Sequence, residues 1–223
     1  MQRLIIINFS LILLVSFACT TAKKQYKIGM KKFSHGEYEF AIPKFQNALN
    51  KGYSAAKTNF MIAESYRLSN RIYEAEPFYK NAIDTNIRNE SAYFYYGYGL
   101  KSQEKYKDAS ARFKEYLEVG TNFDFISRAK KEIKNLKEIN RIVSKKTYSE
   151  ATNLAALNTE AIEYSPYILD DNIVFTSSRG VQKLYAATGT GFTDLYQFEF
   201  NYKDKSSGIT TPFDEPINLF DTH

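Results

Sequence analysis

The residue types most often used in catalysis are scarce in this chain of 223 residues. Its two histidines, His35 and His223, have no second metal ligand or nucleophile beside them, so zinc sites and histidine-based triads lack their residues. The adjacent Asp170 and Asp171 suit a tight turn better than a paired acid and base, because their side chains diverge in a hairpin. Residues 189–191 (Gly-Thr-Gly) lack the lysine and the following helix of a phosphate loop. The sequence therefore predicts no enzyme, no metal and no cofactor.

The one cysteine, Cys19, directly follows an apolar N-terminal run. Arg3 precedes residues 4–17, which contain few polar side chains, a pattern typical of a signal-peptide core and short for a membrane span. A single cysteine forms no disulfide within its own chain. The segment resembles a bacterial lipoprotein lipobox, with Ala18 before the cysteine, although Ser16 stands where leucine is commonest.

This resemblance implies that residues 1–18 are a lipoprotein signal peptide and that Cys19 is lipidated. Several acyl chains would then anchor the mature protein stably. No aspartate follows Cys19, so the expected location is the outer membrane, facing the periplasm. Ordinary cleavage after Ala18 would instead release a soluble periplasmic product, and an uncleaved segment would itself be an anchor.

Length and charge divide the chain into two parts. A chain of 223 residues suggests two domains. Residues 1–150 carry a net charge of +11, whereas residues 151–223 carry −6. This asymmetry suits either an anionic partner or two parts that attract each other. Nucleic acid is not an expected partner, because the chain has no basic-aromatic recognition motif and its N-terminus indicates export.

Residues 22–121 repeat with a period of 34. Three sets of positions share this spacing: Ala41, Ala75 and Ala109; Gly29, Ala63 and Gly97; and the rings Phe45, Tyr79 and Phe113. Each unit predicts two amphipathic helices, with the small residue where the helices cross. One pair cannot bury its apolar stripe alone, so the pairs are expected to stack.

The pattern resembles the tetratricopeptide repeat, with units at about 22–55, 56–89 and 90–121. The sequence departs from that family at Tyr116, which replaces an alanine, and in lacking a proline at the end of each repeat. A further helix at 124–145, capped by Asn122 or Asp124, is expected to close the array. Its basic face is either a solvated end or a site for phosphate-bearing envelope material; its cations are Arg128, Lys130, Lys131, Lys134, Lys137, Arg141, Lys145 and Lys146.

In this family the first helix of each repeat lines a concave groove. The resemblance places these residues in a partner-binding groove: Tyr26, Met30, Phe33, Phe60, Glu64, Arg67, Phe94, Tyr98 and Lys101. Rings and cations suit an extended peptide or a short helix with an acidic end. In the alternative interpretation the rings pack under neighbouring repeats and the array is a rigid spacer.

From residue 147 the helical period is lost. Residues 147–158 are expected to form a linker or lead-in strand, followed by strands at 164–169, 172–177, 182–186 and 194–200 with a hairpin at Asp170 and Asp171. Three motifs resemble the WD-like β-propeller repeat of TolB-type proteins: Tyr164-Ser165-Pro166, Ile173-Val174-Phe175-Thr176-Ser177-Ser178-Arg179 and Asp194-Leu195-Tyr196. The resemblance implies a first propeller blade, with residues 212–223 leading to a second, and a chain that is the N-terminal part of a longer protein.

Together these features predict an α+β fold in separate domains: residues 1–18 as signal peptide, 19–146 as the repeat array with its capping helix, and 147–223 as linker and incomplete blade. The combination resembles a family of OmpA-like envelope lipoproteins, some of which are accessory factors of type IX secretion or gliding. It implies a non-enzymatic, outer-membrane-anchored periplasmic scaffold that binds an envelope protein or peptide, and peptidoglycan only through a domain absent here. The alternatives are a propeller-based ligand binder or hydrolase-like sensor with the repeats as a stalk, and a soluble periplasmic repeat chaperone.

Overall fold

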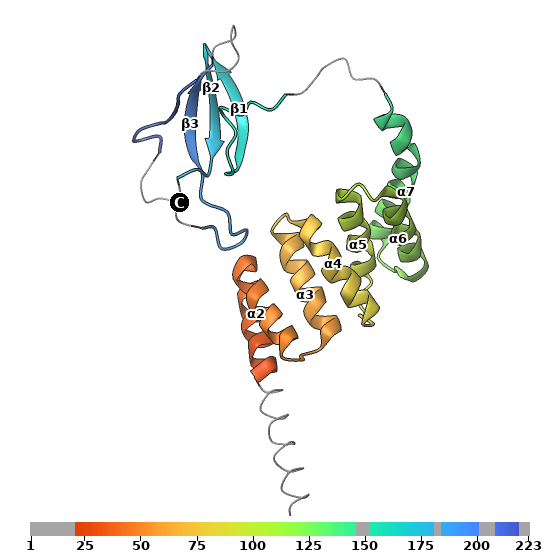
Figure 1. The fold of residues 1–223 in the computed structure, drawn as a ribbon. Coiled ribbons are helices and arrows are strands. Elements are labelled where there is room, and N and C mark those ends of the chain that lie inside the picture. Colours follow the sequence, from red (N-terminus) through yellow and green to blue (C-terminus); the bar gives the residue numbers. More distant parts are fainter. Residues whose placement is uncertain (1–20, 146–151, 181–183, 201–207, 219–223) are drawn as a thin grey trace, which may run out of the picture. The chain divides into compact units, whose positions relative to one another are not determined.

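The chain divides into two compact units at residue 145, one helical and one built on a β-sheet (Figure 1). The structure, a computed structural model, describes residues 21–145, 152–180, 184–200 and 208–218. The predicted fold class, a helical repeat array followed by a separate antiparallel β unit, is confirmed at this level.

Seven helices follow one another in the described part of the first unit. The first covers residues 21–34, and the others are α2 (Tyr38–Asn50), α3 (Ala55–Leu68), α4 (Ile72–Asp84), α5 (Ser91–Ser102), α6 (Tyr106–Val119) and α7 (Phe123–Val143). Helices that are neighbours in the sequence pack side by side, as the row from α2 to α7 shows (Figure 1). The three predicted pairs are therefore the helix at 21–34 with α2, α3 with α4, and α5 with α6.

The positions that share the 34-residue spacing lie at equivalent helix crossings. A Cβ atom added to Gly29 would lie 2.7 Å from the ring of Phe45, and one added to Gly97 would lie 2.8 Å from the ring of Phe113. Only a small residue permits so close an approach. The alanines of the second helices, Ala41, Ala75 and Ala109, are fully buried. The period in the sequence thus reflects a repeated packing contact.

Helix α7 continues this register and ends the array. Asn122 caps it as predicted, because its side-chain oxygen accepts a hydrogen bond of 3.0 Å from the backbone N–H of Phe125. Ala129 and Leu136 are buried in the helical core. Lys131 lies 34 residues after Gly97 and is exposed. Its long side chain occupies the position where a small residue would let a further helix cross.

The sheet of the second unit is a four-stranded antiparallel meander with strand order β1-β2-β3-β4. Its strands are β1 (Glu163–Leu169), β2 (Asn172–Ser177), β3 (Asp194–Glu199) and β4 (Thr210–Pro212). The predicted hairpin is confirmed, since Leu169 pairs with Asn172 and Asp170 has a φ of 53° in the turn between them. Phe175, Phe198 and Leu157 form the buried centre of this unit.

Two predictions for this segment are wrong within the described residues. The predicted strand at 182–186 is absent from 184–186, where Leu184 makes only an isolated bridge to Gly191. The fourth strand is instead β4, in a segment interpreted from sequence as a connection at Pro212. Proline lacks the N–H donor, but it is tolerated here because β4 is at the edge of the sheet. Residues 152–158 form no strand, and Leu157 packs into the sheet core.

Candidate functional site: the first-helix surface

The nine predicted groove residues lie on the first helix of each pair, and we call the surface that they form the first-helix surface. In the first pair, Tyr26, Met30 and Phe33 are half-buried and pack against the neighbouring core. The ring of Tyr26 lies 4.5 Å from that of Tyr53 and 5.4 Å from that of Phe45. Burial, with Tyr53 nearby, raises the pKa of Tyr26. This part of the surface is therefore an apolar patch with a neutral phenol.

The two charged groove residues of the second pair, Glu64 and Arg67, neutralise each other. Arg67 donates hydrogen bonds to both carboxylate oxygens of Glu64, at 3.0 and 2.6 Å, and its guanidinium lies 4.1 Å from the ring centre of Tyr95. Burial alone would lower the pKa of Arg67, but the paired Glu64 outweighs it and raises that pKa. Tyr79 also donates to Glu64, and burial followed by that carboxylate raises the pKa of Tyr79 well above its usual value. Phe60 is half-buried, and its ring packs edge-on against that of Tyr79 at 6.3 Å.

Helix α7 packs against the inner positions of the third pair. Phe94 is fully buried, with its ring parallel to that of Phe125 at 4.5 Å. The Tyr98 hydroxyl donates to Glu132 at 3.1 Å, and Lys101 forms an ion pair of 2.7 Å with the same carboxylate. The array thus uses these three side chains internally, an arrangement that the groove prediction did not include.

Arg128 belongs to this surface and not to the outer face of α7, where the sequence analysis placed it. Its guanidinium carbon lies 5.1 Å from the ring centre of Phe94 and 5.5 Å from that of Tyr98. Arg67 and Lys101 have carboxylate partners, but Arg128 is exposed and forms no ion pair within the described residues. The 34-residue spacing could have placed Arg128 and Glu132 on this surface. Arg128 follows Phe94 by 34 residues, and Glu132 follows Tyr98 by the same interval.

A pocket adjoins the first-helix surface at the start of α3. It has a volume of about 660 Å³ and is lined by Ser54, Ala56 and Lys57 from one loop and helix start, and by residues 85–90 from the connection between α4 and α5. Lys57 lies three residues before Phe60, on the same side of α3. Glu90 also lines the pocket, and its carboxylate accepts hydrogen bonds from Thr121. Lys57 and Arg88 are exposed and form no ion pair within the described residues, so the pocket can accept an anionic group. The sequence analysis missed Arg88.

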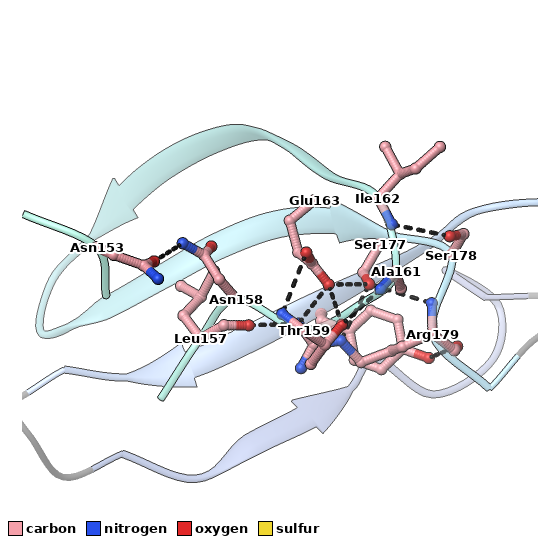
Figure 2. A network of polar contacts seen from close by, with 11 residues as sticks. Asn153, Leu157, Asn158, Thr159, Ala161, Ile162, Glu163, Ser177, Ser178 and Arg179 are labelled. Carbon is pink, nitrogen blue, oxygen red and sulfur yellow. Dashed lines mark hydrogen bonds and ion pairs between the residues drawn. The ribbon is translucent and has the colours of Figure 1, made fainter. Parts of the chain in front are cut away.

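The polar network of the sheet unit is structural. Arg179 donates to the carbonyl of Leu157 at 2.6 Å and to Glu163 at 3.0 Å, and the Ser177 hydroxyl donates to the same Glu163 oxygen at 3.1 Å (Figure 2). Partial burial would raise the pKa of Glu163, but hydrogen bonds from Thr159, Arg179 and Ser177 together lower it. All partners come from this unit, so the network fixes the segment before β1 against the end of β2.

The residues considered for catalysis are not assembled into a site. His35 is a surface side chain 3.9 Å from Glu37, and Asp170 and Asp171 lie in the hairpin turn. Within the described ranges, no three His, Cys, Asp or Glu side chains come together to hold a metal ion. Cys19 and His223 lie outside the described residues. Of the described helices, none has the length and apolar character that a membrane span requires.

The helical unit has the fold of known tetratricopeptide-repeat domains. It is similar to the C-terminal tetratricopeptide-repeat domain of a Plasmodium falciparum FK506-binding protein, with 15% identity, a TM-score of 0.51, and coverage of 57% of this chain and 95% of that one. The Sgt2 domain from Aspergillus fumigatus gives 18% identity, 59% and 89% coverage and a TM-score of 0.47.

A third solved structure is the Yersinia enterocolitica type III secretion chaperone SycD, in complex with a peptide of the translocator YopD. It gives 14% identity, coverage of 54% of this chain and 95% of that one, and a TM-score of 0.47. No family model and no curated protein sequence matches the chain. The likeness to the Plasmodium falciparum domain defines the class of fold, a tetratricopeptide-repeat array.

Proposed function

We propose that this protein is a non-enzymatic scaffold that holds a partner protein or peptide on the first-helix surface and in the adjoining pocket. The observation that carries the proposal is the pair of cations that line the pocket, Lys57 and Arg88, which have no carboxylate partner in the described chain, together with Phe60, one turn after Lys57 on α3. Such a site suits a segment with an apolar side chain for Phe60 and a carboxylate for the cations.

Most charged side chains on the surrounding first-helix surface already have a partner of opposite charge, which favours a preformed site. Glu64 and Glu132 neutralise Arg67 and Lys101, so binding there requires no rearrangement of charge. Arg128 supplies a further unpaired cation over aromatic rings. Binding to a rigid surface loses little conformational entropy, so the affinity there does not depend on the buried area alone.

A capture experiment tests this proposal. The full chain and its variants would be used to recover binding partners from an envelope extract, with quantification of the proteins identified. Phe60→Ala and the double change Lys57→Glu with Arg88→Glu are expected to reduce recovery of a specific partner at least tenfold, because they remove the apolar contact and reverse the pocket charge. Tyr73→Ala is the matched control, since Tyr73 is 60% exposed on the second helix of its pair. Equal recovery with all variants would favour a rigid spacer.

The proposed setting is the periplasmic side of the outer membrane, with the protein anchored by lipid on Cys19 and serving an OmpA-like envelope or type IX secretion accessory complex. The lipobox resemblance supports this location. Replacing Cys19 with serine and separating detergent from aqueous phases tests it. The expected result is transfer to the aqueous phase, and unchanged membrane partition of the variant would refute lipidation.

We also propose that the sheet is the first blade of a β-propeller. The meander order of the strands supports this. Exposed apolar side chains on β1 also support it, because a neighbouring blade would cover them: Tyr167 is 67% exposed and Leu169 is 50% exposed. The gene beyond the codon for His223 provides the test. Further copies of the Tyr-Ser-Pro and Ser-Ser-Arg pattern are expected, and a stop codon at that point would contradict the proposal.

A further inference from the structure

The outward side of α7 carries a continuous row of cations. Residues three and four apart lie on one side of a helix, and by this spacing the row comprises Lys130, Lys134, Lys137 and Arg141, with Lys131 beside it; we call these five residues the α7 basic stripe. All five are exposed. At a rise of about 1.5 Å per residue, the stripe is about 17 Å long.

The positive charge of the stripe is not balanced locally. Within the described residues, only Arg141 has an ion pair, at 2.6 Å from Glu138. Glu132, the other acidic residue in the middle of α7, contacts Tyr98 and Lys101 on the opposite side. On other outward helices some cations are paired with neighbouring acids, namely Lys80 with Asp84 on α4 and Arg112 with Glu115 on α6. On α7, by contrast, four of the five cations in the stripe have no ion pair within the described residues.

An exposed aromatic ring extends the same side of the helix. Phe123 lies seven residues before Lys130, two turns away on the same face, and is 81% exposed. Lys131 stands 34 residues after Gly97, where a small residue would be needed for a further helix to cross. A further repeat helix is therefore not expected to cover this face. A partner that fits must provide anionic groups along a line and an apolar layer beneath them. An anionic lipid bilayer provides both, since phosphates lie above acyl chains.

We propose that the α7 basic stripe and Phe123 form a peripheral binding surface for an anionic membrane. The cations contact lipid phosphates and the ring of Phe123 enters the headgroup boundary. This surface is separate from the pocket at Lys57 and Arg88 and from Cys19, so it does not depend on the proposed partner binding or on lipidation. Each lysine near such a surface strengthens binding by roughly fivefold, and neutralising three would weaken it by about a hundredfold.

Vesicle binding by the full chain tests the proposal. Binding would be measured with vesicles of phosphatidylcholine alone and of phosphatidylcholine mixed with phosphatidylglycerol, at low and high salt. The measured quantity is the gain in binding on adding anionic lipid, so that any contribution of the apolar residues 4–17 is common to both vesicle types. The gain is expected to disappear when Lys130, Lys134 and Lys137 are all changed to Gln, and to fall at high salt.

The matched control changes Lys51, Lys107 and Lys114 to Gln, because these lysines are also exposed but lie on other helices and connections. The control is expected to retain the gain, and circular dichroism would verify that both variants stay folded. Phe123→Ser is expected to reduce the gain that remains at high salt. Equal loss in the control, no loss in the stripe variant, or binding to duplex DNA without any gain on anionic vesicles would each overturn the proposal.

Discussion

Replacing Phe94 with alanine separates a structural role from a partner-binding role for this predicted groove residue. Phe94 is fully buried and its ring contacts five others, with centre-to-centre distances of 4.5 Å to Phe125, 5.1 Å to Tyr98, 5.3 Å to Tyr95, 5.4 Å to Tyr116 and 5.8 Å to Phe113. Removing such a ring leaves a cavity between α5, α6 and α7. We expect the change to lower the free energy of unfolding by about 4 kcal/mol.

Urea denaturation followed by far-ultraviolet circular dichroism measures this loss, because the helical array dominates that signal. With a denaturant slope of about 2 kcal/mol per molar urea, the midpoint moves down by about 2 M. A domain of this kind has a total stability of about 5–15 kcal/mol, so the variant stays folded or becomes marginal. Tyr73→Ala is the control and is expected to stay within about 0.5 kcal/mol of the unchanged protein. A Phe94 variant within about 1 kcal/mol would refute the assignment of this ring to the core.

Two further changes examine the helix crossing and the sheet network. Gly97→Val is expected to destabilise the array by about 1–3 kcal/mol in the same denaturation experiment, because the added carbon would lie 2.8 Å from the ring of Phe113. Glu163→Gln is expected to remove part of the acid sensitivity of the sheet unit. The lowered pKa of Glu163 means that its carboxylate stabilises the fold at neutral pH and that this contribution is lost as the pH falls below about 4. Hydrogen exchange of the Ser178 amide measures the second effect.

Distinct outcomes would contradict these two predictions. If Gly97→Val is as stable as the unchanged protein, the Phe113 ring can move aside and the crossing does not need a small residue. If Ser178 exchange has the same pH dependence in the Glu163 variant and in the unchanged chain, then Glu163 does not link the network to pH. The amide is a suitable reporter because Ser178 donates its backbone N–H to the carbonyl of Ile162, just before Glu163.

The helices were predictable from the sequence because a single packing contact recurs. Gly29 and Gly97 are required where Phe45 and Phe113 cross the partner helix, and a contact of this kind imposes the 34-residue spacing on the sequence. The hairpin at Asp170 was also predictable, since a two-residue turn between β-rich runs has a local signature.

What the sequence did not determine depended on contacts between segments that are not adjacent. It left open whether Phe94 lines a groove or packs under a neighbouring helix, because the burial of this ring depends on its tertiary contact with α7. The residues 184–186 contain Leu and Tyr, but their pairing is limited to one bridge with Gly191. The segment at Thr210–Pro212 is short and ends in proline, which is depleted in strands, and it forms β4 by pairing with β3, with Tyr196 opposite Pro212.

The lysine at position 131 also constrains how this protein can change in length. Copying a two-helix unit onto the end of α7 would force a bulky cation into the position that Gly29, Ala63 and Gly97 occupy in the array, where only a small residue fits at the helix crossing. Duplication of a unit upstream of α7 meets no such obstacle, because every interior crossing already has a glycine or an alanine. Longer descendants of this array are therefore expected to arise by internal insertion, with the helix that bears Lys131 retained as the terminal element.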